Sequence, residues 1–203
     1  YYFFNTNLLM QFEIFKFETV TSTNDIAMNL IRKKKKEIGF IYADIQVNGR
    51  GTKGRKWISE MGNLFGSFFF PLKKNIPPFD EFSVINPVII SEIIIKLCKD
   101  KEISFKWPND IFVNGRKICG ILQEVITFKG KKFLIIGVGI NITSNPKINN
   151  NYETTNIFNE SNQKPSLREI IELLIKSYEK FFNEIQKYNF VYFKKKTEQM
   201  SLK

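Results

Sequence analysis

The chain has 203 residues, and 31 lysines and arginines against 20 aspartates and glutamates give it a formal net charge of +11. It has no histidine and two cysteines, which excludes Ser-His-Asp and Cys-His catalysis, zinc sites that use histidine, and a four-cysteine zinc site. No apolar run approaches the roughly 20 residues of a membrane-spanning helix. We expect one domain outside the membrane, cytoplasmic, or organellar if an upstream targeting segment has been removed.

The positive charge fits a nucleic acid, a membrane surface or an acidic ligand. Its distribution favours none of them, because the two lysine-rich runs at residues 32–36 and 194–196 are typical of solvated helix ends. No pattern typical of a recognition helix is present. We therefore expect no sequence-specific binding to nucleic acid.

Apolar–polar alternation and short apolar runs predict strands in the first half at residues 13–18, 40–47 and 64–70. Between the first two, several hydroxyl and amide side chains offer helix caps, and apolar residues at helical spacing end in the lysine run. A second helix is predicted over residues 82–99, with Pro87 either starting or kinking it.

The second half begins with hairpin signals. Asn114-Gly115 lies between two apolar runs, and a second turn at Lys129-Gly130 precedes the run 133–140, which predicts a three-stranded meander. Residues 141–165 are rich in asparagine and predict a long loop. A capping box at residues 165–169 then opens an amphipathic helix that continues to Ile185.

Residues 49–57 form the most unusual stretch, with three glycines, four cationic side chains and a terminal tryptophan. This composition is typical of a loop that closes over an anion. The spacing also matches a dinucleotide fingerprint, but no helix follows it, and Arg55-Lys56 replace the Lys-Ser/Thr pair of a phosphate-binding P-loop. A plain solvated basic turn remains the alternative from composition alone.

Two further runs make the sequence specific, Lys106-Trp107-Pro108-Asn109-Asp110 and residues 116–124, RKICGILQE. With these in view, the chain resembles a biotin protein ligase. Residues 49–57 resemble the biotinoyl-adenylate loop of that family, residues 21–24 the start of its biotin pocket, and residues 137–141 its nucleotide-side strand. Together the motifs cover most of residues 13–145.

The resemblance and the predicted elements imply an α+β domain over residues 1–203, with a core at 13–187 and a mixed, mainly antiparallel sheet backed by helices. The implied reaction joins biotin and ATP into biotinoyl-5′-AMP, and a lysine of a biotin carboxyl carrier domain then takes the biotin. ATP, biotin and Mg²⁺ are the implied ligands.

The resemblance also implies roles for individual residues. The catalytic residues would be Lys117, Arg50 and Asp110, and Asp110 would hold Mg²⁺. Biotin would be bound by Ser22, Thr23, Asn24, Gln46, Gly49, Arg50, Gly51, Thr52, Lys117 and Gly120. ATP would be bound by Arg50, Lys53, Arg55, Trp57, Asn109, Lys117 and Asn141, with Trp57 stacking on adenine when the loop orders.

The chain departs from the family in two ways. Thr52 occupies a position at which the family commonly has arginine, and Lys53 is a candidate substitute. We also expect neither a helix-turn-helix before residue 13 nor a small β domain after the long helix, and either a monomer or a homodimer. Two other functions stay open, a lipoate or octanoate ligase of the same superfamily and a non-catalytic biotin- or nucleotide-binding module.

Overall fold

The computed structural model describes residues 9–147 and 152–201. The sheet of this part of the chain has seven strands in the order β1-β2-β3-β7-β6-β5-β4. Only β1 and β2 run parallel, and every other neighbouring pair is antiparallel. The predicted mixed, mainly antiparallel sheet backed by helices is confirmed, and the class is α+β.

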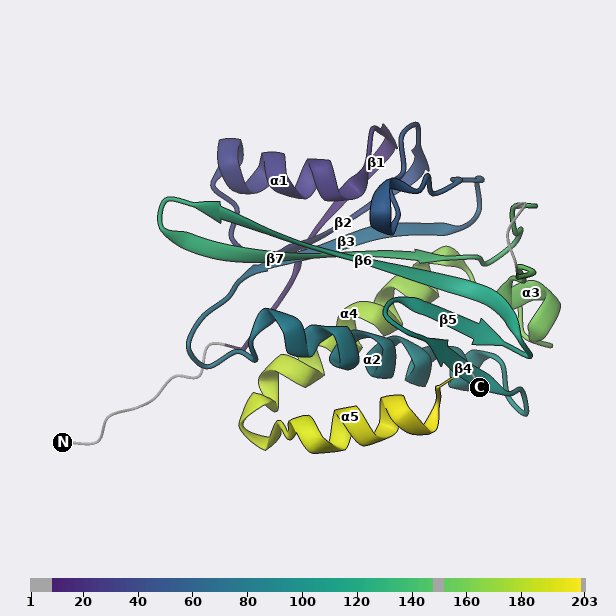
Figure 1. Ribbon diagram of the computed structural model, residues 1–203. Helices are drawn as coiled ribbons and strands as arrows, with labels where there is room; N and C mark the ends of the chain where they lie inside the picture. The colour runs from purple at the N-terminus through teal and green to yellow at the C-terminus, as the bar shows by residue number, and fades with distance from the viewer. Residues whose placement is uncertain (1–8, 148–151, 202–203) are drawn as a thin grey trace.

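The strands are β1 (Glu13–Val20), β2 (Gly39–Gln46), β3 (Leu64–Pro71), β4 (Ile103–Lys106), β5 (Asp110–Val113), β6 (Arg116–Phe128) and β7 (Lys131–Ile140). The α-helices are α1 (Thr23–Lys34), α2 (Phe82–Leu97), α3 (Ile157–Glu160), α4 (Leu167–Asn183) and α5 (Phe190–Gln199). Helix α1 covers one face of the sheet, α2 and α4 cover the other, and α5 packs on the outer side of α2 (Figure 1).

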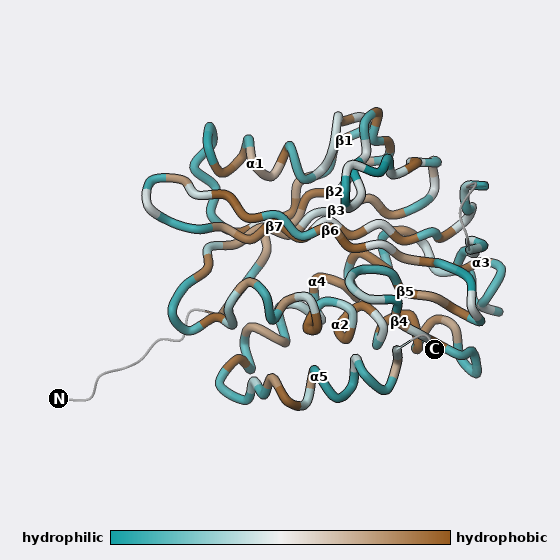
Figure 2. The backbone as a smooth tube through the Cα atoms, viewed as in Figure 1, coloured by the Kyte–Doolittle hydropathy of each residue, from teal (hydrophilic) through white to brown (hydrophobic). Residues whose placement is uncertain are grey.

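The strands alternate between two cores because successive side chains point to opposite faces. On β3, Phe68 and Phe70 pack into the large core beneath α2 and α4, whereas Phe69 packs into a smaller core beneath α1. Figure 2 shows apolar residues lining the inner layers and polar residues on the outer turns of the helices. Among the described residues, no helix combines the length and the apolar character needed to cross a bilayer.

Local signals place most of the element ends. The Asn114-Gly115 and Lys129-Gly130 turns both have positive φ at their two central residues, the backbone geometry of tight hairpins. Ser166 and Glu169 form the reciprocal capping box that opens α4, and the lysine run ends α1. Helix α2 begins at Phe82 and contains Pro87, so of the two roles considered for Pro87, starting the helix is excluded.

Two further predictions need correction, and one helix was not predicted. The hairpin region also contains β4, which pairs with β5, so the meander has a fourth strand. The predicted loop at residues 141–165 contains α3 and a segment that pairs with β6 at Lys117 and Thr154. Helix α5 was not predicted; it packs against α2, where Thr197 donates a hydrogen bond to the Val84 carbonyl.

Candidate active site

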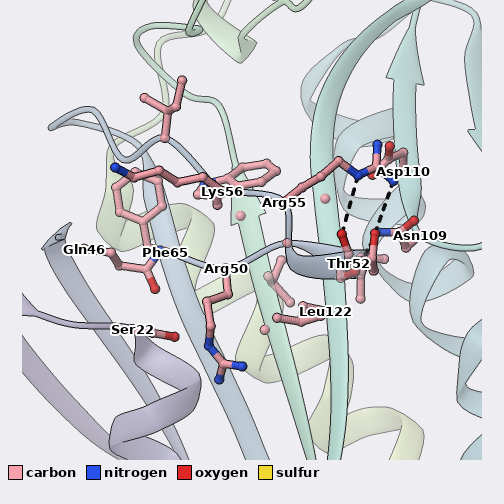
Figure 3. A pocket seen from close by; sticks show the side chains of 18 of the residues that line it. Ser22, Gln46, Arg50, Thr52, Arg55, Lys56, Phe65, Asn109, Asp110 and Leu122 are labelled. Atoms are coloured by element: carbon pink, nitrogen blue, oxygen red, sulfur yellow. Dashed lines mark hydrogen bonds between the residues drawn. The ribbon is translucent and has the colours of Figure 1, made fainter. Parts of the chain in front are cut away.

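One cavity gathers most of the residues that the sequence singled out. It lies between the start of α1, the loop at residues 49–57 and the middle of β6 and β7. Figure 3 shows several of these side chains converging from separate elements. The cavity is lined by Ser22, Thr23, Asn24, Gln46, Arg50, Gly51, Thr52, Arg55, Trp57, Asn109, Asp110, Lys117, Gly120 and Asn141. Of the predicted site residues, Gly49 and Lys53 do not line it.

The floor of the cavity is a hydrogen-bonded group of buried polar side chains. The Thr23 backbone N–H donates to the Gln46 side-chain oxygen at 2.9 Å, and the Thr23 hydroxyl donates to the same oxygen at 3.2 Å. The Ser67 hydroxyl lies 2.7 Å from the Thr23 hydroxyl and 2.5 Å from the Asn24 side-chain oxygen. Because these groups hold one another, the floor is arranged before any ligand arrives.

Ser22 and Gly49 are two buried residues close to the floor. Ser22 is 3 % exposed and precedes the first turn of α1, where its hydroxyl makes no capping hydrogen bond. Gly49 is buried, and a Cβ there would lie 2.7 Å from the Trp57 carbonyl oxygen and 3.0 Å from the Gln46 amide nitrogen. Gly49 is therefore needed for close approach to its neighbours, outside the cavity itself.

Lys117 lies opposite the loop, on β6. Its ammonium group is 2.8 Å from the Asp110 carboxylate of β5, and both side chains are nearly buried. The same ammonium lies 5.3 Å from the Trp57 ring centroid and 5.4 Å from that of Tyr152. A carboxylate and two aromatic faces therefore hold the cation at a defined point of the cavity wall.

Trp57 lies flat on the sheet where two strands carry glycine. A Cβ at Gly120 would lie 2.5 Å from the Trp57 ring, and a Cβ at Gly139 would lie 2.4 Å from it. Glycine at these two positions therefore leaves room for the Trp57 ring against the strands. The Trp57 ring N–H is buried and has no hydrogen-bond acceptor among the described residues.

The loop divides into a stem and a tip. In the stem, Arg50 and Lys56 form a β-bridge, the Gly51 N–H donates to the Arg55 carbonyl at 2.7 Å, and the Trp57 N–H donates to the Gly49 carbonyl at 2.8 Å. The tip is the short 3₁₀ turn Thr52–Gly54 together with the Arg55 side chain that follows it, and it contains no buried residue. Backbone hydrogen bonds thus hold the stem, while the tip extends into solvent.

At the tip, Thr52 is the one side chain with partners on both sides. Its hydroxyl accepts hydrogen bonds from the Asn109 amide at 3.4 Å and from the Arg55 guanidinium at 3.5 Å (Figure 3). The Arg55 and Lys53 side chains are exposed, and Lys53 has a left-handed backbone with φ of 56°. The cations of the tip therefore face solvent and are available to an anion.

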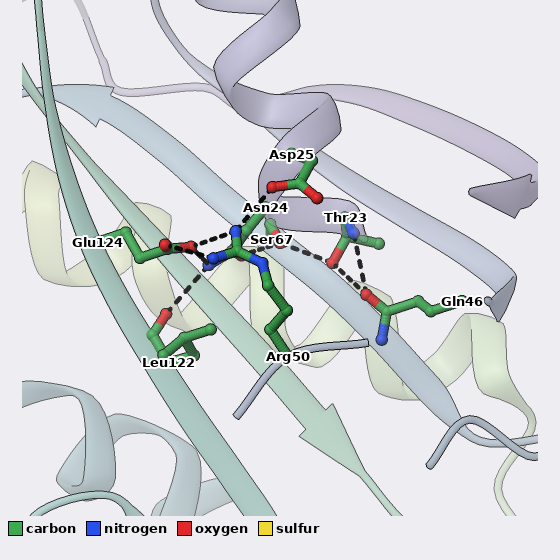
Figure 4. A network of polar contacts seen from close by, with 8 residues as sticks. All are labelled: Thr23, Asn24, Asp25, Gln46, Arg50, Ser67, Leu122 and Glu124. Carbon is green, nitrogen blue, oxygen red and sulfur yellow. Dashed lines mark hydrogen bonds and ion pairs between the residues drawn. The ribbon is translucent and has the colours of Figure 1, made fainter. Parts of the chain in front are cut away.

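Arg50 differs from the other cations of the loop because carboxylates already neutralise it. Its two terminal nitrogens donate to both oxygens of Glu124 at 2.8 and 2.9 Å and to Asp25 at 2.7 Å (Figure 4). Burial acts to lower the pKa of Arg50, but the hydrogen bonds and charges of Glu124 and Asp25 outweigh it and raise the pKa. Arg50 is a fixed, permanently charged group.

The far end of the cavity is closed by residues 152–156, which dock on β6. The Lys117 N–H donates to the Glu153 carbonyl, and the Thr155 N–H donates to the Lys117 carbonyl. Asn141 is 4 % exposed, and its side-chain amide donates to the Thr155 carbonyl at 2.9 Å. The Asn141 side-chain nitrogen thus helps to hold this segment, and the segment places the Tyr152 ring next to Lys117.

Metal ligands are sparse at the site. Asp110 is the carboxylate nearest Lys117, and the part of the chain that the structure describes holds no group of three His, Cys, Asp or Glu side chains able to bind a metal. Trp107 lies in the turn between β4 and β5 and is 67 % exposed.

The site also uses residues for which no individual role was predicted: Asp25, Ser59, Ser67 and Tyr152, together with Glu124, Gly137 and Gly139 from the runs 116–124 and 137–141. Ser67 had a readable signal, since it is the one hydroxyl within the otherwise apolar, fully buried strand β3. Asp25 and Glu124 had none, because an acidic residue in a first helical turn or on a strand is ordinarily a surface residue.

Comparison with known proteins gives consistent relatives. The chain is 36% identical over 125 residues to the bifunctional ligase/repressor BirA of Escherichia coli, a match covering 61% of this chain and 38% of BirA. It is 32% identical over 149 residues to biotin–protein ligase 2 of Arabidopsis thaliana, covering 70% and 44%. The match thus spans about two fifths of the length of these curated relatives.

Solved structures agree with the sequence matches. The biotin protein ligase of Leishmania major in complex with biotin superposes with a TM-score of 0.80 at 25% identity, covering 94% of this chain and 82% of that one. The biotin protein ligase of Aquifex aeolicus in complex with biotin and ATP gives a TM-score of 0.77 at 26% identity, covering 94% and 78%. The model of the biotin/lipoate A/B protein ligase family matches residues 16–141, and the chain belongs to this family.

Proposed function

We propose that this chain is the catalytic domain of an ATP-dependent biotin protein ligase, which forms biotinoyl-5′-AMP and passes biotin to a lysine of a carrier domain. One observation carries the proposal. A neutral hydrogen-bonding floor, a held lysine and a loop with exposed cations line the same cavity. The floor suits recognition of a neutral ring, and the lysine and the loop cations suit the joining of a carboxylate to a nucleotide phosphate.

The floor suits the ureido ring of biotin. That ring offers one carbonyl acceptor and two N–H donors, and Ser22, Thr23, Asn24 and Gln46 provide hydroxyl and amide groups of both kinds. The Thr23–Gln46 and Asn24–Ser67 contacts fix the orientation of these groups, so little ordering is left for the ligand to impose. Ser67 acts in this scheme by holding Thr23 and Asn24.

Lys117 is the proposed catalytic residue of adenylate formation. When the biotin carboxylate attacks the α-phosphorus of ATP, two anionic groups approach each other. The bond from the α-phosphorus to the oxygen that bridges to the β-phosphate breaks, and pyrophosphate leaves. An ammonium held beside both groups stabilises the charge of the transition state. Asp110 and the two rings hold the ammonium of Lys117 in position before the substrates arrive.

The loop would complete the nucleotide site. Lys53 and Arg55 are exposed cations on a turn that a bound polyphosphate can draw inward, and Arg55 can bind phosphate oxygens in a bidentate way. Trp57 offers an aromatic face for adenine, and Asn109 and Asn141 line the nucleotide side. Gly51 leaves room for the ligand to approach the backbone of the stem.

Mg²⁺ fits the site as a companion of the nucleotide. Mg²⁺ is commonly held by one or two carboxylates together with phosphate oxygens, and Asp110 supplies one carboxylate next to Lys117. When bound, the ion would neutralise phosphate charge. The donor set is too small for a metal held by the protein alone, so Asp110 would contribute one ligand and the phosphates the others.

The test is pyrophosphate release by the purified chain with ATP and biotin, lipoate or octanoate in parallel, followed by biotin transfer to a carboxylase carrier domain. We expect release with biotin, loss of release in Lys117→Ala, and one biotin on the carrier. Release with lipoate or octanoate alone would assign a lipoate-type ligase. Tight biotin binding without any release would assign a binding module.

A further inference from the structure

The Arg50 guanidinium is turned away from any phosphate by two acidic partners. Glu124 takes both terminal nitrogens in a bidentate pair at 2.8 and 2.9 Å, and Asp25 takes one of them at 2.7 Å. The side chains of Arg50, Glu124 and Asp25 are 34%, 22% and 37% exposed, so the group is partly shielded from solvent. Two carboxylates against one guanidinium leave this cluster with a net negative charge.

Glu124 links this cluster directly to the floor. The same Glu124 oxygen that pairs with Arg50 accepts a hydrogen bond from the Asn24 amide at 2.7 Å. The other end of the Asn24 side chain meets the Ser67 hydroxyl at 2.5 Å, as Figure 4 shows. One unbroken chain of polar contacts therefore runs from the loop stem through Glu124 and Asn24 to the Thr23–Gln46 pair.

Three elements meet at Arg50. Asp25 lies in the first turn of α1, Glu124 lies on β6, and Arg50 belongs to the stem of the loop. To bind Arg50, an anion would have to displace either Asp25 or Glu124, and it would be repelled by the carboxylate that remains. The exposed cations of the tip have no such partner to displace, so a phosphate gains more by binding there.

We propose that Asp25 and Glu124 are positioning residues that make Arg50 a strut between the loop stem and the biotin floor. In this arrangement Arg50 and Glu124 set the orientation of Asn24, and thereby the affinity for biotin, while the phosphates are bound by Lys117 and the tip. The inference rests on the proposed ligase function, because it assigns the cations of that same site to two tasks, organising the biotin floor and binding the phosphates of ATP.

The two possible roles of Arg50, positioning Asn24 or binding phosphate, predict different effects of mutation. If Arg50 and Glu124 act together, removing either one leaves the same defect, an Asn24 without its fixed partner. Glu124→Ala and Arg50→Ala should then each weaken biotin binding by about tenfold, the scale of one charge-assisted hydrogen bond. The double variant should be no worse than the worse single variant, because residues in one network are not additive.

The experiment measures biotin affinity by calorimetry without ATP, and then KM for ATP and kcat for pyrophosphate release at saturating biotin. We expect the Kd for biotin to rise in Arg50→Ala and Glu124→Ala by a larger factor than the change in either ATP parameter. Glu124→Gln, which keeps an acceptor for Asn24, should recover part of the affinity. Arg55→Ala should show the reverse pattern, with a raised KM for ATP and an unchanged Kd for biotin.

Two controls keep the outcomes separate. Arg168→Ala removes an exposed arginine that pairs with Glu172 on α4, remote from the cavity, and should leave all three quantities unchanged. Thermal unfolding of every variant identifies any that fail to fold; for those, Arg50→Lys and Glu124→Gln replace the alanine variants. A parent that binds no biotin would overturn the proposed function itself.

The inference is overturned by a defined result in a parent that binds biotin and releases pyrophosphate. That result is an Arg50→Ala variant that binds biotin normally but shows a tenfold or larger rise in KM for ATP or a tenfold or larger fall in kcat. Additive losses of biotin affinity in the double variant would equally contradict a shared strut.

Discussion

The floor of the cavity and the tip of its loop are built on opposite principles. Thr23, Asn24 and Ser67 are at most 3 % exposed and hydrogen-bonded to one another, whereas Lys53 and Arg55 are exposed cations on a short turn. A buried neutral network is costly to leave half-satisfied, so its groups are held in one arrangement. Exposed cations repel one another and gain order only when an anion arrives.

This difference indicates where each kind of selectivity resides. The floor should discriminate between ligands by hydrogen bonds that are already in place, which suits a ring with fixed donors and acceptors. The tip should respond to charge, which suits a polyphosphate and then its adenylate product. Lys117 lies between the two regions, against Trp57 and Tyr152, and should serve the step that joins them.

The largest expected effect comes from removing the group between the two regions. Lys117→Ala should lower the rate of adenylate formation by about a hundredfold or more, the scale of losing one preorganised charge donor. Biotin affinity should change far less, because the floor does not depend on Lys117. Pyrophosphate release under single-turnover conditions measures the first quantity and calorimetry the second.

The matched control is Lys176→Ala, which removes an exposed lysine of α4. Near-normal pyrophosphate release by the Lys117 variant would contradict the assignment of Lys117 as the catalytic cation.

The next effect concerns the tip and its missing arginine. Thr52→Arg should slow release of the adenylate by about tenfold to a hundredfold, since a charge-assisted hydrogen bond contributes about 1.5–3 kcal/mol. The parent should accordingly be a leaky ligase that biotinylates bystander lysines. Single-turnover measurement of adenylate dissociation in the parent and the variant provides the comparison.

Lys53→Ala tests the competing explanation in the same assay. If this variant loses the adenylate quickly and Thr52→Arg holds it no longer than the parent, Lys53 already supplies the missing cation. The leaky-ligase idea would then have to be dropped.

A smaller effect is expected from the floor. Ser67→Ala leaves the Asn24 oxygen and the Thr23 hydroxyl without their shared partner, and biotin should bind about fivefold more weakly, the scale of one neutral hydrogen bond. Ser91→Ala is the control, because the Ser91 hydroxyl is buried on α2 and has no partner among the described residues. Equal biotin affinities for the two variants would show that the floor is not organised by Ser67.

The smallest effect is a change in protection within the loop. Backbone amides of the tip, Thr52–Gly54, should exchange hydrogen fast in the free protein and become protected when biotin and ATP are added together. The Gly51 and Trp57 amides of the stem already have acceptors and should change little. Exchange followed by mass spectrometry distinguishes stem from tip, and an unprotected tip in the ternary mixture would contradict its role as a lid.

Short-range chemistry made much of this fold readable from the sequence. Asn114-Gly115 and Lys129-Gly130 favour positive φ locally, and Ser166 with Glu169 satisfies helix N–H groups within one turn. Each of these signals involves residues within a few positions of one another. The order of the motifs likewise sufficed to indicate the family, since their types and spacing do not depend on knowing the contacts.

The segments that were misjudged depend on distant partners. Residues 141–165 were predicted to be a long loop, but Asn141 and Lys117 bind the backbone at residues 153–155 and hold that segment against β6. Helix α5 has a weak apolar face of its own and is positioned by packing against α2. Neither contact could be inferred from local composition.

The sequence by itself determined which residue types are available: no histidine, a loop rich in glycine and cations, and a lysine within a strand motif. Only the tertiary structure decided how the cations divide their work. Arg50 pairs with Glu124, 74 positions away, and with Asp25, 25 positions away, while Lys53 and Arg55 stay exposed. The reason is physical: a charge is neutralised by what lies near it in space, and the sheet brings β6 and the start of α1 to Arg50 and leaves the tip in solvent.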